Sequence, residues 1–158
     1  MSKYKFLDAT FDNVSGISTA TIQTELGIFE GKAQLHDEDR DIVSAYEGCK
    51  YAEGRAIIKY HKAVLKQKKA IYNNLKNMIT NLERMNGYNK DSKEARFIRK
   101  QFYMAQKDYN DYKENIAKIE EYLYDRMKSY RGLREDYLKA LEKSRTKSAQ
   151  EEKEEKSE

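Results

Sequence analysis

Apolar residues recur along two long stretches of the chain with the spacing of an α-helix. The longer stretch, residues 98–140, keeps a four-three repeat of seam positions, and Arg126 is the one charged residue among them. Such a repeat places one seam along a helix, and an apolar seam needs a partner. The seam consists of Ile98, Phe102, Ala105, Tyr109, Tyr112, Ile116, Ile119, Leu123, Arg126, Tyr130, Leu133, Tyr137 and Ala140.

Residues 49–85 supply that partner. Two sevenfold apolar series, which start at Ile57 and Ile58, give this stretch a wide apolar face. A polar break with a glycine follows, and Asp91 with Glu94 three places later is typical of a capping box at the start of a second helix. We therefore expect an antiparallel helical hairpin joined by a short loop.

The N-terminal part of the chain has a different pattern. Residues 4–11, 17–24 and 28–35 are rich in β-branched and aromatic residues and are separated by turn residues, so they predict three short strands. Gly27 ends the short connection between the second and third strands, which favours a hairpin with a left-handed glycine. The odd-numbered residues of the third strand form an apolar face, which a helix must cover.

Together these patterns predict an α+β fold, with a small N-terminal three-stranded antiparallel sheet followed by a long, coiled-coil-like helical hairpin. Residues 1–48 would hold the sheet and a short helix that ends at Gly48. Residues 49–145 would form the hairpin, packed on the sheet, and residues 146–158 a disordered charged tail.

The second predicted helix is longer than the first, so its far end lacks a partner within the hairpin. It could cover the sheet, bend at Gly132, or pair with a second copy of the chain. We expect this end of the helix to contact the sheet, and self-association is the second possibility. A homo-oligomer would form through this end. The residues of the expected oligomer interface are Tyr130, Leu133, Tyr137 and Leu141.

Composition changes this picture in two respects. The absence of proline in 158 residues permits long uninterrupted helices, and the single cysteine, Cys49, cannot form an internal disulfide. The first 20 residues lack the pattern of a signal peptide, and no stretch is apolar enough to span a membrane. We expect a soluble protein of a reducing cytoplasm, without a membrane partner.

Charge is unevenly distributed along the chain. Residues 1–48 hold 4 Lys and Arg against 9 Asp and Glu, whereas residues 49–86 hold 9 against 2. The basic residues of the first helix would form one outward row, here called the basic ridge, which suits phosphates or an acidic protein surface. The alternative is a solvated face that keeps the protein soluble. The basic ridge consists of Arg55, Lys59, Lys62, Lys66, Lys69 and Lys76.

An acidic segment precedes the first helix and is a second candidate surface for a partner. Acidic residues before a helix also satisfy its free N–H groups and its dipole, which is the simpler interpretation. A calcium loop is rejected, because its sixth and twelfth positions would be Ile42 and Gly48 instead of glycine and glutamate. The acidic segment contains Asp37, Glu38, Asp39 and Asp41.

Enzymatic chemistry has little support in the sequence. Cys49 with His61 or His36 could pair a nucleophile with a base, but a lone cysteine at a helix start is more often a packing residue. His61 lies on the apolar face, so we expect a core or interface residue at this position. Two histidines and one cysteine do not make a zinc site, and phosphate-binding glycine motifs are absent. We expect no enzyme activity, no cofactor and no metal.

Residues 18–59 contain a run of short segments, namely Thr21-Ile22, Glu25-Leu26-Gly27, Phe29-Glu30-Gly31, Leu35-His36-Asp37-Glu38-Asp39, Gly48-Cys49-Lys50-Tyr51-Ala52-Glu53 and Arg55-Ala56-Ile57-Ile58-Lys59. In these segments the chain resembles a family of small proteins encoded by phages and prophages of low-GC Gram-positive bacteria. The likeness covers about a quarter of the chain and brings no established active site. It implies a phage accessory protein in the cytoplasm of the host bacterium, a class in which inhibitors of host defence, including anti-CRISPR proteins, are common.

The leading functional prediction is therefore a non-enzymatic phage protein that binds and inhibits a host defence protein or its nucleic-acid complex. One alternative is a nucleic-acid-binding accessory protein of phage replication or packaging, which would use the basic ridge. Another is an oligomeric assembly protein, which would use the seam of the second helix.

Overall fold

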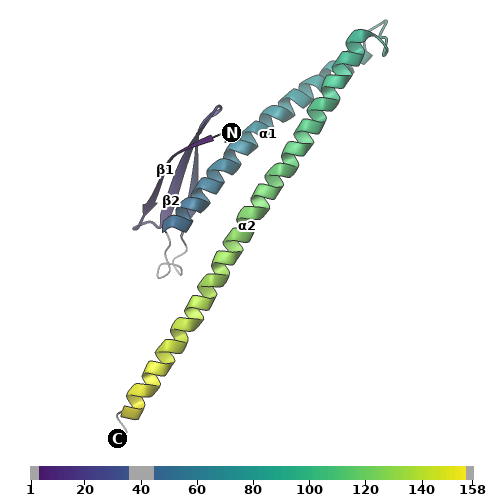
Figure 1. Cartoon of the computed structure of the whole chain (residues 1–158). Coiled ribbons are helices and arrows are strands. Elements are labelled where there is room, and N and C mark those ends of the chain that lie inside the picture. The colour runs from purple at the N-terminus through teal and green to yellow at the C-terminus, as the bar shows by residue number, and fades with distance from the viewer. Residues whose placement is uncertain (1–3, 36–44, 156–158) are drawn as a thin grey trace. The chain divides into compact units, whose positions relative to one another are not determined.

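The computed structural model describes residues 4–35 and 45–155. Strands β1 (Tyr4–Asp12), β2 (Ile17–Thr24) and β3 (Gly27–Gln34) are followed by helices α1 (Ala45–Glu83) and α2 (Lys93–Glu155) (Figure 1). The predicted α+β fold, with a three-stranded antiparallel sheet and a helical hairpin, is confirmed. The chain divides into two compact units, residues 1–120 and 121–158, so the sheet, α1 and the first part of α2 belong to one unit.

The sheet has the strand order β1-β2-β3, and both pairs are antiparallel. Ile22 pairs with Phe6 on β1 and with Phe29 on β3, which places these residues on one face of the sheet. A register shift between Phe6 and Asp8 interrupts β1, as in a β-bulge. Gly27 has a φ of 117°, so the predicted positive φ at this turn is confirmed.

Helix α1 approaches the inner face of the sheet through small residues. A Cβ atom on Gly31 of β3 would collide with the carbonyl oxygen of Ala52. The adjacent positions Ala20 and Ala33 are also small and buried, and together with Ala52 they form one core cluster. The helix therefore lies against the backbone of the sheet itself, and not on a layer of large side chains.

The start of α1 differs from the prediction. A separate short helix that ends at Gly48 is wrong, because α1 begins at Ala45 and continues through Gly48. Gly48, Ala52 and Ala56 follow each other at intervals of four residues and so share the face that meets the sheet. A Cβ atom on Gly48 would collide with the hydroxyl oxygen of Ser18, which is buried. This glycine allows close packing and does not end the helix.

A second core cluster lies next to the first and contains the largest fully buried side chain, Tyr60. Its ring meets Phe29 edge-to-face, with 5.8 Å between ring centroids. Ile22 and Ala56 complete the buried part of this cluster. Partly buried residues from the strands, the β2–β3 turn and α1 surround it: Tyr4, Leu26, Phe29, Ile57 and Val64.

The two helices of the hairpin meet along the predicted seam. Tyr72 of α1 stacks on Phe102, at 5.2 Å between centroids, and on Tyr109, at 6.0 Å. Ile116 of the seam is buried at 6% exposure, and Ala95, which precedes the seam on α2, is buried at 3%. Aromatic rings therefore fill the space between the helices, which confirms the seam in the part of α2 that belongs to the first unit.

Helix α2 begins one residue after its cap. Ser92 accepts a hydrogen bond from the backbone N–H of Ala95 at 3.1 Å, so Ser92 caps the helix, and not Asp91 as predicted. The backbone N–H of Asp91 donates instead to the side chain of Asn89, in the loop. In the second unit α2 continues to Glu155, beyond the end at residue 145 that the composition predicted.

Candidate nucleic-acid interface

Basic residues concentrate in the hairpin, on both helices and the loop between them. Residues 59–107 contain 13 Lys and Arg against 3 Asp and Glu, while the rest of the chain contains 18 against 24. All of residues 59–107 belong to the first unit. We call the exposed cations of residues 59–107 the basic hairpin surface.

The first two members of the basic ridge form hydrogen bonds to the sheet. Arg55 donates from Nη1 to the backbone carbonyl of Lys32 at 2.6 Å, and Lys59 donates from Nζ to that of Glu30 at 2.7 Å. Both carbonyls belong to β3, an edge strand. The two cations therefore occupy hydrogen-bond acceptors that an added strand would need, a common protection of edge strands.

Lys62 forms an ion pair with Glu120 of α2 at 2.7 Å. Both side chains are well exposed, so the pair contributes little to stability, about 0–1 kcal/mol. It nevertheless neutralises part of the charge of Lys62. The predicted ridge is therefore not a uniform row: Arg55, Lys59 and Lys62 have partners within the protein.

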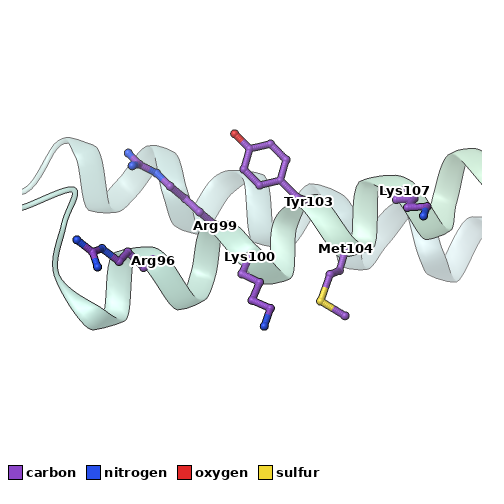
Figure 2. Close-up of a pocket in the computed structure, with 6 residues that line it drawn as sticks. All are labelled: Arg96, Arg99, Lys100, Tyr103, Met104 and Lys107. Carbon is purple, nitrogen blue, oxygen red and sulfur yellow. The ribbon is translucent and has the colours of Figure 1, made fainter.

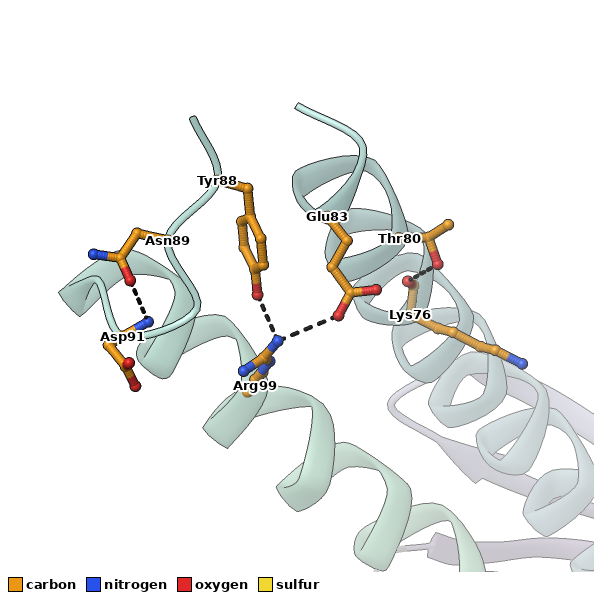
Figure 3. Close-up of polar contacts among 7 residues, drawn as sticks. All are labelled: Lys76, Thr80, Glu83, Tyr88, Asn89, Asp91 and Arg99. Carbon is orange, nitrogen blue, oxygen red and sulfur yellow. Dashed lines mark hydrogen bonds and ion pairs between the residues drawn. The ribbon is translucent and has the colours of Figure 1, made fainter. Parts of the chain in front are cut away.

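The remaining members of the basic ridge are exposed. Among the described residues, Lys66, Lys69 and Lys76 have no ion-pair partner. The backbone carbonyl of Lys76 accepts from Thr80, an ordinary contact within a helix (Figure 3). Their ammonium groups are therefore available to an external anion.

A second basic group lies on α2, and the sequence analysis missed it. Four cations, one tyrosine and one methionine line a shallow hollow of about 530 Å³ (Figure 2). No carboxylate is among its lining residues. The spacing of Arg96, Lys100, Tyr103 and Lys107 is four, three and four, which is the signal that could have found it. The lining residues are Arg96, Arg99, Lys100, Tyr103, Met104 and Lys107.

Arg99 fixes this group to the tip of the hairpin. Its Nη2 donates to Glu83 at 3.2 Å and to the hydroxyl of Tyr88 at 2.5 Å, so it joins the end of α1, the loop and α2 (Figure 3). Arg96 pairs with Asp91 at 3.6 Å, with both side chains more than half exposed. Within the described part of the chain, Lys100 and Lys107 have no ion pair.

A polar junction connects the β2–β3 turn, α1 and α2. Tyr60 donates to the carboxylate of Glu25 at 2.6 Å, and His61 Nδ1 lies 2.7 Å from the hydroxyl of Tyr112. Burial, together with the hydrogen bond to Glu25, raises the pKa of Tyr60 far above its ordinary value of 10. Burial also raises the pKa of Tyr112. The junction is structural, since each of its groups is engaged by another side chain.

The interpretation of His61 as an interface residue is confirmed by its contact with Tyr112. His61 cannot act as a base for Cys49, because the two residues lie twelve positions apart on α1, which is about 18 Å along the helix. Within residues 4–35 and 45–155, no three His, Cys, Asp or Glu side chains gather where they could hold a metal ion. No helix in the same residues is long and apolar enough to cross a membrane.

Two groups of predicted site residues stay predictions. The acidic segment Asp37, Glu38, Asp39 and Asp41 lies outside the described residues. The expected oligomer interface is within α2, but its side chains are outside the described part of the structure: Tyr130, Leu133, Tyr137 and Leu141.

Comparison with protein-family models, curated proteins and solved structures finds no match to this chain.

Proposed function

We propose that this protein is a non-enzymatic binding protein whose basic hairpin surface contacts the phosphate backbone of a nucleic acid. One observation carries the proposal: exposed lysines without an ion pair in the described structure occur on both helices, Lys66, Lys69 and Lys76 on α1 and Lys100 and Lys107 on α2. Unneutralised cations on a rigid hairpin attract a polyanion, and releasing counterions from its phosphates favours binding.

The charge distribution favours nucleic acid over an acidic protein as the partner. The cations extend along α1 and return along α2, and exposed apolar side chains such as Ile71, Met78 and Phe97 are interspersed among them. A protein interface is usually built around a desolvated core of apolar and aromatic anchors. Cations spread along both helices suit repeated contacts with phosphates, which position a nucleic acid without reading its sequence.

The leading prediction from the sequence was an inhibitor of a host defence factor. It relies on the acidic segment, which lies outside the described residues, and on the resemblance to phage proteins. Both proposals place the protein in the cytoplasm of a host bacterium. They differ in whether the purified protein binds naked nucleic acid.

The test is a titration of labelled DNA and RNA with the purified full chain at several salt concentrations. The triple variant Lys66→Glu, Lys69→Glu, Lys76→Glu should lose most binding. The matched control, Lys113→Glu, Lys118→Glu, Lys128→Glu, makes the same charge change at exposed lysines outside residues 59–107. It should retain most of the affinity.

Salt dependence provides the second readout. On duplex DNA the logarithm of the binding constant should fall with that of the salt concentration with a slope of about −0.9 per neutralised phosphate, or about −3 for three contacts. The ridge variant should flatten this slope. An unmodified protein that binds neither DNA nor RNA at low salt would contradict the proposal and favour a protein partner.

A further inference from the structure

The hollow on α2 differs in chemistry from the rest of the basic hairpin surface, because it contains an exposed aromatic ring. Tyr103 is 64% exposed and Met104 is 57% exposed, both large values for such side chains. In Figure 2, Arg99 and Tyr103 project from one side of the helix and Lys100 and Met104 from the other. The seam does not use either Tyr103 or Met104.

Cations flank Tyr103 along its own helix. Arg99 precedes it by four residues, Lys100 by three, and Lys107 follows it by four, so each lies about one helical turn away. Phe102, which packs in the seam, meets the ring edge-to-face at 5.5 Å between centroids. The ring is therefore supported from the seam while most of it remains accessible.

An accessible ring among cations is the arrangement that binds single strands. A base that is not paired can stack on an aromatic side chain, while neighbouring lysines and arginines hold the phosphates on either side. Bases of a duplex are stacked on each other, so an exposed ring on one helix has no free face of a base to meet. Binding of this kind tolerates any base sequence.

We propose that the hollow lined by Arg96, Lys100, Tyr103 and Lys107 binds single-stranded nucleic acid, with one base stacked on Tyr103 and phosphates held by the three cations. This inference rests on the proposed function and specifies the strand type that the basic hairpin surface prefers. Arg99 acts as a positioning residue, because Glu83 and Tyr88 already engage its guanidinium.

Fluorescence anisotropy with labelled oligothymidine, oligouridine and a duplex of the same length tests the inference. A length of about 12 nucleotides is within the site sizes of single-strand binding proteins. Tyr103→Ala should weaken binding to the single strands about 5- to 140-fold and leave duplex binding unchanged. Tyr103→Phe, which keeps the ring, should bind like the unmodified protein.

Tyr122→Ala is the matched control. Tyr122 also lies on α2 and is 63% exposed, but its neighbours in sequence include Glu121 and Asp125. Its replacement should not change binding to any of the three probes. Comparison of oligothymidine with oligouridine separates DNA from RNA as the preferred strand.

The outcomes separate this inference from the proposed function. Equal affinity of Tyr103→Ala and the unmodified protein for single strands would overturn the inference, while loss of binding in the ridge variant would leave the proposed function intact. Lys100→Glu with Lys107→Glu gives a second check, because it should weaken single-strand binding more than the control lysine changes. Absence of binding to all probes would overturn both.

Discussion

Gly31 determines how closely α1 approaches the sheet. Its backbone faces Ala52 and Ala56 of the helix, and no side chain, not even a methyl group, fits between them. The contact buries backbone and methyl surface without immobilising long side chains, so little rotamer entropy is lost. Gly31 therefore has a strict steric requirement, although its side chain is only a hydrogen atom.

Gly31→Ala should destabilise the protein by about 1–3 kcal/mol or more, because the added methyl group must displace helix backbone. Chemical denaturation followed by circular dichroism measures this change. Gly132→Ala is the control, since nothing lies within 4 Å of the added methyl group and alanine favours a helix. It should be neutral or slightly stabilising. Equal stability of the two variants would contradict the packing described here.

Tyr60 predicts a dependence of stability on alkaline pH. Its pKa is raised in the folded state, so the folded protein holds the phenol proton more tightly than the unfolded chain. The free energy of unfolding should therefore fall as the pH rises above the unfolded value of 10. Below that pH the contribution is fully present.

Tyr60→Phe removes this titration and should show a shallower loss of stability above pH 10. Tyr112, whose pKa is also raised, should leave part of the slope in the variant. Urea denaturation at neutral pH and at several alkaline values checks the difference. Parallel curves for the two proteins would show that Tyr60 ionises equally easily in both states.

At the scale of elements, Ser92 and Asp91 differ in their role at the start of α2, because only Ser92 caps the helix. Ser92→Ala should cost about 1 kcal/mol of stability, because the N–H of Ala95 loses its acceptor. Asp91→Ala should cost less, since Asp91 makes only an exposed contact with Arg96 through its side chain. Thermal denaturation of the two variants checks the order. A larger loss for Asp91→Ala would restore the cap that the sequence predicted.

Periodicity was a sufficient guide to the elements, but not to close contacts between them. The strands and both helices follow from repeats of two and of three to four, as Tyr72 of α1 and the seam residue Phe102 illustrate. Gly48 was misread because a glycine that ends a helix and one that admits a neighbouring strand look alike in sequence. Only the contact with Ser18 distinguishes them.

The sequence predicts the part of the candidate site that lies on α1, but not the part that lies on α2. The row on α1 is visible as a regular series, although the contacts of Arg55, Lys59 and Lys62 depend on tertiary structure. The hollow on α2 does not show in the overall charge of the second helix, because acidic residues further along the helix offset the local excess. A shorter window would have found Lys100 and Lys107.

At the scale of the whole molecule, the distribution of charge is as informative as the fold. Cations exceed acidic residues by ten within residues 59–107, whereas acidic residues exceed cations by six elsewhere. A protein with this asymmetry attracts a polyanion to one segment and repels it from others. Its net charge of +4 conceals this division.

Self-association is the other property of the whole molecule that can be tested. If the far end of α2 pairs with a second copy, Leu133→Glu should lower the apparent mass in light scattering at micromolar concentration. Ser129→Glu adds the same charge at an exposed position of the same helix and should have less effect. An unmodified protein of 18.7 kDa at all concentrations would contradict this prediction.

The order of contacts along the chain has a consequence for synthesis on the ribosome. β1, β2, β3 and α1 meet their neighbours in the order in which they are made, so their contacts close short loops and can form early. Ile22, Ala56 and Tyr60 would be buried while α2 is still being translated. Until Phe102 emerges, Tyr72 has no ring on α2 to stack on, and the apolar face of α1 on the nascent chain stays exposed to solvent.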